Sequence, residues 1–221
     1  MYLSVSVIIP VHNGAPYIRE AIESVMSQAL PAAEIIVVDD GSTDETSGIL
    51  SAMENVRYVR QEKSGQAIAR NRGFAESTGD LIAFLDADDV WMPEKLALQV
   101  AALDSDPPFD CVFGLAVEFA GSRPPAREIE LQRKHDAHLP GAMLVRRNMF
   151  AAVGPYDAQW RVGEVVDWYA RAVDLGLRMT TLQHVVLLRR IHGDNLGRRS
   201  RDPSRDYLSV LRRSINRRRD R

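Results

Sequence analysis

The feature that most constrains the fold of this chain is a regular alternation of short apolar runs with amphipathic segments in its first half. Runs of strand length occupy residues 5–11, 34–40, 56–61 and 81–85. Near-continuous apolar runs are typical of strands that are buried on both faces. The segments between them carry apolar residues at helical spacing, as Ile18, Ile22 and Val25 do. This alternation predicts an α/β fold with a mostly parallel central sheet and helices on both faces.

The second half of the chain changes rhythm after Pro108. The segment Ser122–His138 is polar and broken by prolines, so we predict a mobile loop there. On either side of it we expect strands over residues 110–121, 142–147 and 184–191, with a helix over 164–176. The length of 221 residues suits one compact domain with a tail, and we expect that domain to cover residues 1–197.

Cysteine usage and the absence of long apolar runs bear on the compartment. Cys111 is the only cysteine of the chain, so an internal disulfide framework is excluded and a reducing compartment fits. The start of the sequence lacks the pattern of a secretory signal. The sequence has no apolar stretch that approaches the roughly 20 residues needed to span a bilayer. We therefore expect a cytoplasmic protein.

The charge of the chain is unevenly distributed. The segment 198–221 contains ten Arg and three Asp, a net +7, which leaves −9 for residues 1–197 because the whole chain carries −2. Such a basic tail is either a solvated end of the chain or a surface for anionic lipid head groups. Its residues Leu208, Leu211 and Ile215 stand at helical spacing, so the predicted functional role is peripheral contact with the inner face of a membrane. We expect no nucleic-acid partner.

Polar residues follow the expected strands repeatedly at the points where these end. Asp86, Asp88 and Asp89 come directly after the apolar run 81–85. Ligands bind at the carboxyl ends of strands in open parallel sheets. A divalent cation would offset the repulsion between such closely spaced carboxylates, and a diphosphate would supply its remaining oxygen ligands. The alternative is a simple turn before Pro93.

Two common ways of holding phosphate are missing from the sequence. A dinucleotide-binding fold requires G-x-G-x-x-G directly after the first strand, where this chain has "PVHNG". The Walker loop G-x-x-x-x-G-K-[ST] is missing as well. Phosphate is therefore expected to be held by a metal ion and side chains.

Four ordered motifs carry a resemblance to a known family. They are "VSVIIPVHNGAPYIREAIESVMSQ", "EIIVVDDGSTDET", "GQAIARNRGFAESTGDLIAFLDADDVWMPEKL" and "RRIHGDN". Together they resemble glycosyltransferase family 2, whose members have the GT-A fold and transfer a sugar from a nucleotide-activated donor. The resemblance implies a nucleotide-sugar-binding half over residues 1–106 and an acceptor-binding half over 107–197.

The resemblance also implies roles for individual residues. The D-x-D motif of the family falls on Asp86, near the ribose, and on Asp88, which would bind Mn²⁺ or Mg²⁺ at the diphosphate. His192, in the place of a frequent H-x-x-N motif, would complete the metal site or pair with phosphate, and Asn195 would orient its loop. The residues implied to bind the base and ribose are Pro10, Val11, Asn13, Asp39, Asp40 and Arg70.

At the position of the general base the sequence departs from the family pattern. Aligning Arg171 with an arginine that is common in the family places Val165 at the expected base position. Two neighbouring carboxylates remain, and we predict Asp167 as the base with Glu164 as second choice, because a positioned carboxylate can take the proton of an acceptor hydroxyl. Alternatively, both are only carboxylates favoured at a helix start.

The prediction is a metal-dependent, inverting glycosyltransferase that uses a UDP-linked sugar and serves cell-surface glycan or glycoconjugate synthesis. The acceptor would be a glycan, a lipid-linked molecule or a peptide. Two rivals stay open. One is a non-catalytic nucleotide-sugar-binding domain, which Val165 favours. The other is a sugar-1-phosphate nucleotidyltransferase, which would require a Gly-rich basic loop that "PVHNGAPY" does not provide.

Overall fold

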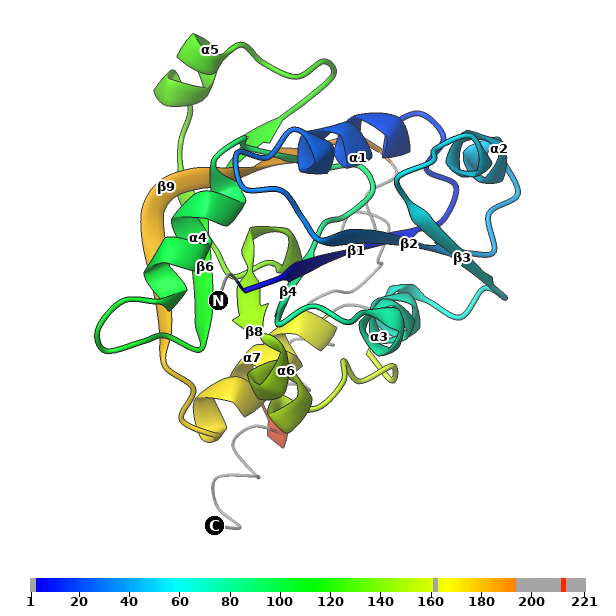
Figure 1. Cartoon of the computed structure of the whole chain (residues 1–221). Helices are drawn as coiled ribbons and strands as arrows, with labels where there is room; N and C mark the ends of the chain where they lie inside the picture. Colours follow the sequence, from blue (N-terminus) through cyan, green and yellow to red (C-terminus); the bar gives the residue numbers. More distant parts are fainter. Residues whose placement is uncertain (1–2, 161–162, 194–211, 214–221) are drawn as a thin grey trace.

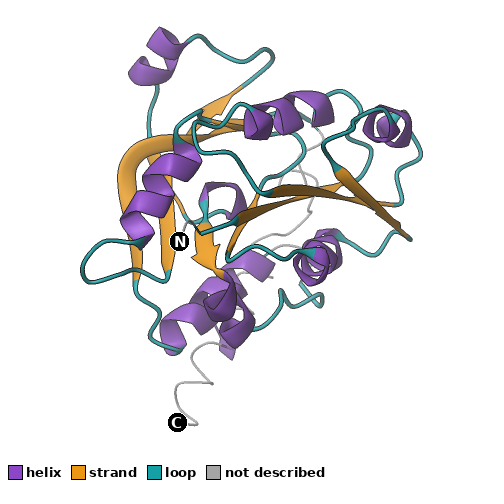
Figure 2. Cartoon of the chain, viewed as in Figure 1, coloured by secondary structure: helices purple, strands orange, loops and turns teal. Residues whose placement is uncertain are grey.

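The computed structural model describes residues 3–160, 163–193 and 212–213, and a nine-stranded sheet runs through it (Figures 1 and 2). The strands are β1 (Val5–Val11), β2 (Glu34–Asp40), β3 (Arg57–Gln61), β4 (Leu81–Phe84), β5 (Val90–Trp91), β6 (Cys111–Phe119), β7 (His135–Ala137), β8 (Leu144–Arg146) and β9 (Met179–Arg190). Their order in the sheet is β3-β2-β1-β4-β8-β6-β9-β5, and β7 pairs with β6.

The long strands of the sheet share one direction. β3, β2, β1 and β4 pair in parallel, with Val7 opposite Ile35 on one side and Ala83 on the other. β8 is antiparallel to both β4 and β6, so β6 runs in the same direction as β4, and β9 pairs with β6 in parallel. The short strands β5 and β7 are antiparallel to their neighbours. The predicted α/β fold is therefore confirmed, and the carboxyl ends of β1, β2, β4, β6 and β9 face the same edge.

Helices cover both faces of this sheet. They are α1 (Ile18–Met26), α2 (Thr46–Ser51), α3 (Gln66–Glu76), α4 (Lys95–Leu103), α5 (Ala126–Leu131), α6 (Arg147–Val153) and α7 (Glu164–Asp174), with a short 3₁₀ helix, η1 (Pro140–Ala142). One core layer joins α1, α2 and α4 to side chains such as Val7, Val37 and Ala83. The opposite layer joins α3, α6 and α7 to Ile8 and Phe84. Because neighbouring strand residues point to opposite faces, both layers bury the same strands.

The segment predicted as a mobile loop contains regular structure. α5 and β7 lie within it, and Ile129 of α5 is buried against Val117, Phe119 and Leu188. Only Ile129 of "AREIEL" is buried, and such a short segment is a weak helical signal, so the sequence pattern did not reveal this anchor. Figure 1 shows α5 projecting from the body of the molecule.

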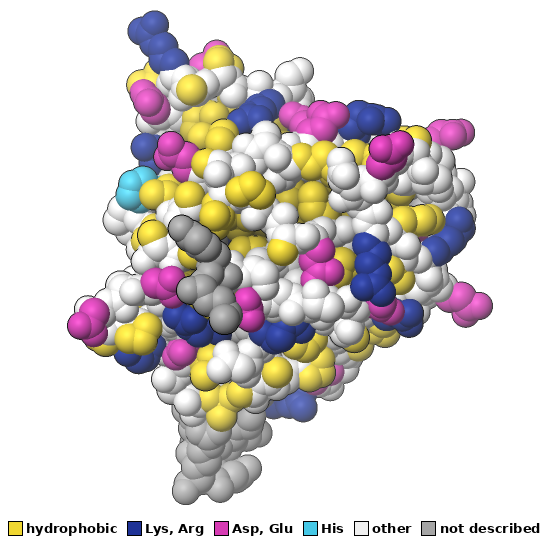
Figure 3. Space-filling model, in the orientation of Figure 1, with side chains coloured by type: hydrophobic (Ala, Val, Ile, Leu, Met, Phe, Trp, Pro, Cys, Tyr) yellow, Lys and Arg dark blue, Asp and Glu magenta, His cyan; other side chains and the backbone are white. Residues whose placement is uncertain are grey.

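Charged side chains of both signs lie on the surface of the protein. Acidic and basic side chains are interspersed on the face shown in Figure 3. Within the described ranges, every helix is too short or too polar to cross a membrane. Most of the basic tail, residues 198–211 and 214–221, and also Asn195, lie outside the described residues, so the predictions made for them stay predictions.

Candidate active site

Asp86, Asp88 and Asp89, called here the acidic tip, follow β4 and meet the end of β9 at the carboxyl edge of the sheet. His192 Nε2 lies 2.9 Å from Asp88 Oδ2, although 104 positions separate the two residues along the chain. Both side chains are partly exposed, at 19% for His192 and 26% for Asp88. The ring of Tyr17, at the start of α1, lies 4.9 Å from the imidazole of His192. Two of the residues predicted to hold a metal therefore do lie together.

Burial and mutual repulsion destabilise the charged forms of two carboxylates of the acidic tip, Asp88 and Asp89. Burial raises the pKa of Asp88, and the negative charge of Asp86 raises it further, while the contact with His192 opposes both effects. Burial also raises the pKa of Asp89 well above its usual value, and the charges of Asp86 and Asp88 add to that effect. A cation bound at this tip would relieve the repulsion.

The donor set fits a metal ion that is shared with a phosphate ligand. Asp88 and His192 offer an oxygen and a nitrogen side by side. In the described part of the chain, no group of three or more His, Cys, Asp or Glu is placed to hold a metal ion. A site made of the described protein groups alone therefore does not fit, whereas one carboxylate completed by phosphate oxygens matches how Mg²⁺ is commonly bound.

Arg70 of α3 connects the acidic tip to the start of α7. Its guanidinium is 2% exposed and donates to Asp86 Oδ1 at 2.6 Å and to Glu164 Oε1 at 2.9 Å. Burial lowers the pKa of Arg70, but the charges of Asp86 and Glu164 outweigh burial and raise it above its usual value. Gln66 Nε2, one turn earlier on α3, also donates to Asp86 at 3.0 Å. Arg70, which is predicted to bind the nucleotide, thus uses two of its N–H groups to bind carboxylates of the protein.

The acidic pair at the end of β2 holds the surrounding loops. Asp39 is fully buried, where it accepts the backbone N–H of Ser42 at 2.7 Å and the hydroxyl of Tyr58 at 2.8 Å. Asp40 accepts the backbone N–H groups of Ser64 and Gly65 at 2.7 and 2.8 Å. These bonds shape the turn after β2 and the entry to α3. These bonds do not test the predicted contacts of Asp39 and Asp40 with base and ribose, which stay a prediction.

The end of β1 lies beside that turn. Pro10 and Val11 are buried strand residues, whereas Asn13 is exposed. The backbone of Asn13 has φ 54°, a left-handed conformation that Asn tolerates better than most residues. Its side chain accepts the N–H of Thr43 at 2.8 Å, and its own N–H donates to the hydroxyl of Ser42 at 2.9 Å. The predicted nucleotide-binding residues of β1 and β2 therefore share one rim.

The two carboxylates of α7 have different surroundings. Glu164 pairs with Arg70 and so is one side chain removed from Asp86. Asp167 is 1% exposed and accepts Arg171 Nε at 2.8 Å. The guanidinium of Arg171 also donates to the carbonyls of Val153 and Pro155, the latter at 2.8 Å. Asp167 thus orients an arginine that fastens the loop before α7.

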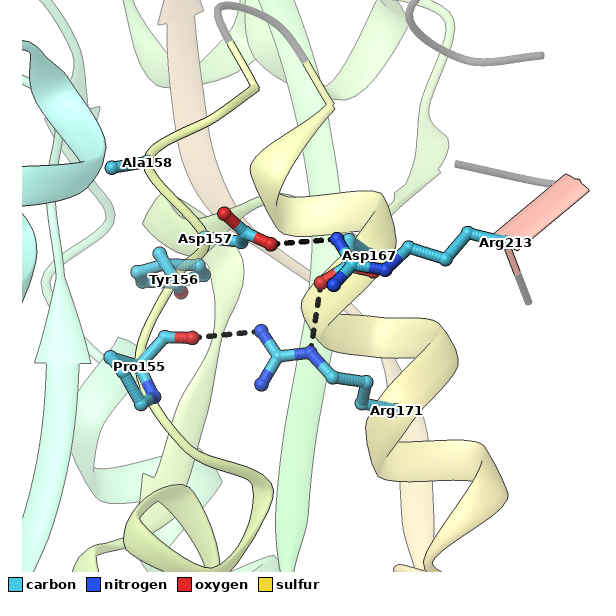
Figure 4. Close-up of a pocket in the computed structure, with 7 residues that line it drawn as sticks. All are labelled: Pro155, Tyr156, Asp157, Ala158, Asp167, Arg171 and Arg213. Atoms are coloured by element: carbon cyan, nitrogen blue, oxygen red, sulfur yellow. Dashed lines mark hydrogen bonds and ion pairs between the residues drawn. The ribbon is translucent and has the colours of Figure 1, made fainter. Parts of the chain in front are cut away.

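Figure 4 shows a pocket of about 390 Å³ beside Asp167. Its lining comes from residues 155–158, from Asp167 and Arg171, and from Arg213 near the end of the chain. Arg213 pairs with Asp157 at 2.8 Å. Each charged side chain of this lining therefore has an ionic partner in the lining itself. Val165, at the position expected for the base, is partly buried against the core of the same layer.

Arg190 is a residue of this region whose role the sequence did not reveal. It belongs to the motif "RRIHGDN", which by itself assigns it no role. The structure buries it to 4% exposure between the acidic tip, α1 and the end of β6. Only its place two residues before His192 pointed to the site, because its contacts are distant in sequence.

Three comparisons with known proteins are consistent with this arrangement. The model of the family described as "Glycosyl transferase family 2" matches residues 6–156. A Nostoc protein described as "Uncharacterized glycosyltransferase alr2836" is 44% identical over 99 residues, which cover 42% of this chain and 31% of that protein. The "Putative teichuronic acid biosynthesis glycosyltransferase TuaG" of Bacillus subtilis is 43% identical over 102 residues, 43% of this chain and 40% of TuaG. The matched segments thus span well under half of these relatives.

Solved structures give the same fold. The S. aureus TarS fragment 1–349 in complex with UDP-GlcNAc superposes with a TM-score of 0.79 at 22% identity, over 96% of this chain and 65% of that one. The same fragment in complex with UDP gives a TM-score of 0.73 at 21% identity, over 95% and 64% of the two chains. At such low identity the likeness establishes the GT-A fold alone. The family match ends before Glu164, Asp167 and His192.

Proposed function

The chain belongs to glycosyl transferase family 2, and from this premise we propose that it transfers a sugar from a nucleoside-diphosphate donor to an acceptor hydroxyl with inversion. The observation that carries the proposal is the meeting of Asp88 and His192, 2.9 Å apart, at the carboxyl edge of the sheet. It supports a site for a divalent cation and a diphosphate at the place where ligands bind in such folds.

In this proposal, residues 1–106 hold the donor. Asp88 and His192 would hold Mn²⁺ or Mg²⁺ together with the diphosphate, and Asp86 would lie near the ribose. When bound, the cation would stabilise the negative charge that develops on the departing diphosphate. The rim formed by Pro10, Val11, Asn13, Asp39 and Asp40 would surround the base. Arg70 would act from behind this rim, since its contacts with Asp86 and Glu164 hold the ribose side of the site in place.

The protein must also remove a proton from the acceptor hydroxyl, because a neutral hydroxyl is a poor nucleophile. Glu164 and Asp167 remain the candidates within the acceptor half, 107–197. The salt bridges favour Glu164, because Arg70 joins it to Asp86, whereas Asp167 is engaged by Arg171 and faces the pocket of Figure 4. Attack from the face of the sugar opposite the diphosphate would invert the anomeric centre with this single base.

UDP is the nucleotide that we propose for the donor. The TarS structures in complex with UDP and with UDP-GlcNAc support this choice through the shared fold. The similarity to TuaG supports an acceptor in the synthesis of a cell-surface polymer. The acceptor would be a glycan, a lipid-linked molecule or a peptide that binds in the half 107–197.

A release assay tests the proposed activity. The purified protein is incubated with a panel of UDP-sugars, Mn²⁺ and candidate acceptors, and released UDP is measured. We expect release that requires Mn²⁺ and falls by at least about a hundredfold in Asp88→Asn, because this change removes a ligand charge. Asp104→Asn, an exposed carboxylate that pairs only weakly with Arg146 at 3.4 Å, is the matched control and should keep normal release. Full release by Asp88→Asn would contradict the metal assignment.

The base can be tested in the same assay. Glu164→Gln should lower the rate of release far more than Asp167→Asn, while both variants retain UDP binding. The opposite ranking would make Asp167 the base, as first predicted. Equal and small effects would exclude both residues as the base, whereas no release by the unaltered protein would favour a second candidate function.

That second candidate is a non-catalytic nucleotide-sugar-binding domain. The observations that favour it are Val165 at the expected base position and the engagement of both neighbouring carboxylates by arginines. A thermal-shift panel of UDP and UDP-sugars, with and without Mn²⁺, separates the two, since binding raises the melting temperature whether or not turnover follows. Mn²⁺-dependent binding without release from any donor would support the binding domain.

A further inference from the structure

Arg190 gathers four separate segments of the chain around the acidic tip. Its backbone N–H donates to Asp89 Oδ1 at 2.9 Å, and its Nε donates to the carbonyl oxygen of Asp88 at 2.9 Å. The remaining guanidinium nitrogens donate to the carbonyl of Gly121 and to the carboxylate of Glu20. The tip, β9, the turn after β6 and helix α1 are thereby joined by one side chain.

Aromatic rings complete the surroundings of this guanidinium. It lies 4.5 Å from the ring centre of Phe119 and 5.0 Å from that of Tyr17. The ring of Tyr17 contacts His192 as well, at 4.9 Å between centroids. Tyr17 is therefore shared by the guanidinium and the imidazole. A planar cation with several fixed donors suits this set of partners, and the ammonium of Lys cannot reproduce it.

These contacts fix the distance between the two halves of the metal-binding pair. Asp88 belongs to the loop after β4, and His192 follows β9, so their approach depends on what ties the loop to that strand. Arg190 makes this connection with two hydrogen bonds. Its side chain donates to the backbone carbonyl of Asp88, and its backbone N–H donates to the carboxylate of Asp89. Because Arg190 is 4% exposed, these contacts are shielded from water.

We propose that Arg190 is a positioning residue that holds Asp88 and His192 in the arrangement required for a divalent cation and a diphosphate. The inference rests on the proposed function for what is bound, but the positioning itself can be tested without a ligand. Arg190 contacts neither the nucleotide nor the sugar in this account. It acts through the loop 86–89 and through the end of β9.

The neighbouring arginine provides a matched control. Arg189 lies on the same strand with opposite orientation, is about one-third exposed, and pairs with Glu118 at 3.0 Å on the surface. Arg190→Lys and Arg189→Lys therefore make the same chemical change one position apart. Glu20→Ala is a milder variant that removes one partner of Arg190 from outside the tip.

The first measurement is hydrogen–deuterium exchange in the ligand-free protein. We expect Arg190→Lys to speed exchange in the peptide 86–92 at least tenfold, Glu20→Ala to speed it about threefold, and Arg189→Lys to leave it within twofold. The amides of β2, residues 34–40, serve as the internal reference and should stay unchanged. Equal acceleration in 86–92 and 34–40, or none in 86–92 for both Arg190→Lys and Glu20→Ala, would overturn the proposal.

The second measurement is calorimetric titration with UDP in the presence and absence of Mn²⁺. Arg190→Lys should weaken Mn²⁺-dependent affinity at least tenfold and change Mn²⁺-independent affinity less than twofold, whereas Arg189→Lys should alter neither. Unchanged Mn²⁺-dependent affinity in Arg190→Lys would overturn the positioning role. If the unaltered protein binds no UDP at all, the proposed function fails, and the exchange experiment alone decides whether Arg190 positions the tip.

Discussion

Arg70 shows how a single buried residue can serve both stability and the site. It carries a charge into the interior and is compensated there by Asp86 and Glu164. Removing one partner of a buried ion pair leaves the others uncompensated, which is costly. The ion pairs that join Asp86, Arg70 and Glu164 therefore contribute both to stability and to the geometry of the site.

We predict that Arg70→Met lowers the free energy of unfolding by about 3–5 kcal/mol, the range found when a buried ion pair is broken. Arg72→Met is the control on the same helix, because Arg72 is 54% exposed and pairs with Glu76 at 2.8 Å. An exposed pair contributes about 0–1 kcal/mol. Urea denaturation of both variants checks this difference. Similar losses for the two variants would contradict the importance given to burial.

Lys95 is a buried cation that no carboxylate of the described residues contacts. Its ammonium donates to Gln99 Oε1 at 2.6 Å and to the carbonyl of Met143 at 3.2 Å, and it lies 4.1 Å from the ring centre of Trp91. Burial lowers the pKa of Lys95 from 10.5 to about 7. Burial also raises the pKa of the nearby Cys111 thiol, and this thiol therefore stays neutral between pH 6 and 9.5.

A definite pH dependence of stability follows from Lys95. Between about pH 7 and 10.5 the unfolded chain binds a proton that the folded chain lacks, so stability rises with pH across this window. Below pH 7 both states are protonated, and the folded state carries the full cost of the buried charge. Each pH unit of the window contributes up to about 1.4 kcal/mol.

We predict that Lys95→Met flattens this dependence. Urea denaturation at pH 6, 8 and 9.5 should show stability that increases with pH in the unaltered protein and changes less in the variant. The loss of partners for Gln99 and Met143 costs about 1–3 kcal/mol at every pH, so the slope and not the absolute value is the relevant quantity. Identical slopes for the two proteins would rule out Lys95 as the source.

At the scale of elements, α3 packs against the sheet at a distance that Gly73 sets. A Cβ atom at this position would lie 2.3 Å from Ile8 Cγ2 and 3.3 Å from Val38 Cγ2. Gly48 of α2 is also helical, but a Cβ there would meet only Glu45 Oε2 at 3.9 Å. The two glycines therefore differ in surroundings and not in secondary structure.

We predict opposite effects of alanine at these two positions. Gly48→Ala should stabilise the protein by about 0.5–1 kcal/mol, because alanine restricts the unfolded chain and favours the helix. Gly73→Ala should destabilise it by about 1–3 kcal/mol, as overpacking does, and by pushing α3 it should also disturb Arg70. Thermal unfolding of the two variants gives the sign directly. Stabilisation by Gly73→Ala would mean that α3 shifts without cost.

The elements differ in how far the sequence reveals them. Strands β1, β2 and β4 are apolar runs, and α1, α3 and α7 have periodic apolar residues, so local patterns predicted them. β5 has only two residues, and its pairing of Val90 with Leu188 depends on chain segments far apart. α5 rests on the burial of Ile129. Likewise, the strand-end rule brought Asp86 and Asp88 to the edge, but the contacts of Arg70 and Arg190 come from tertiary packing.

At the scale of the whole molecule, the basic tail remains a separate functional prediction. The segment 198–221 carries ten Arg and three Asp, against −9 for residues 1–197. A basic segment near an anionic bilayer gains about 1 kcal/mol for each Lys or Arg. An acceptor in cell-surface polymer synthesis would lie at such a surface. The charge of the tail would then hold the domain close to it.

We predict that changing Arg217, Arg218 and Arg219 to Gln weakens binding to vesicles containing phosphatidylserine by about a hundredfold, since three such charges contribute about 3 kcal/mol. Co-sedimentation at low salt measures the affinity. Binding should also weaken as salt rises, because the screening length falls to about 8 Å at physiological ionic strength.

The control for this prediction removes the same charge from the exposed surface of the domain body, at Arg19, Arg123 and Arg127. If net charge alone governs the interaction, both triple variants should lose equal affinity. If the tail is the contact, only the tail variant should lose it, because screening confines the attraction to charges near the bilayer. Equal binding by the tail variant and the unaltered protein would show that the tail does not contact the membrane and is only a solvated end of the chain.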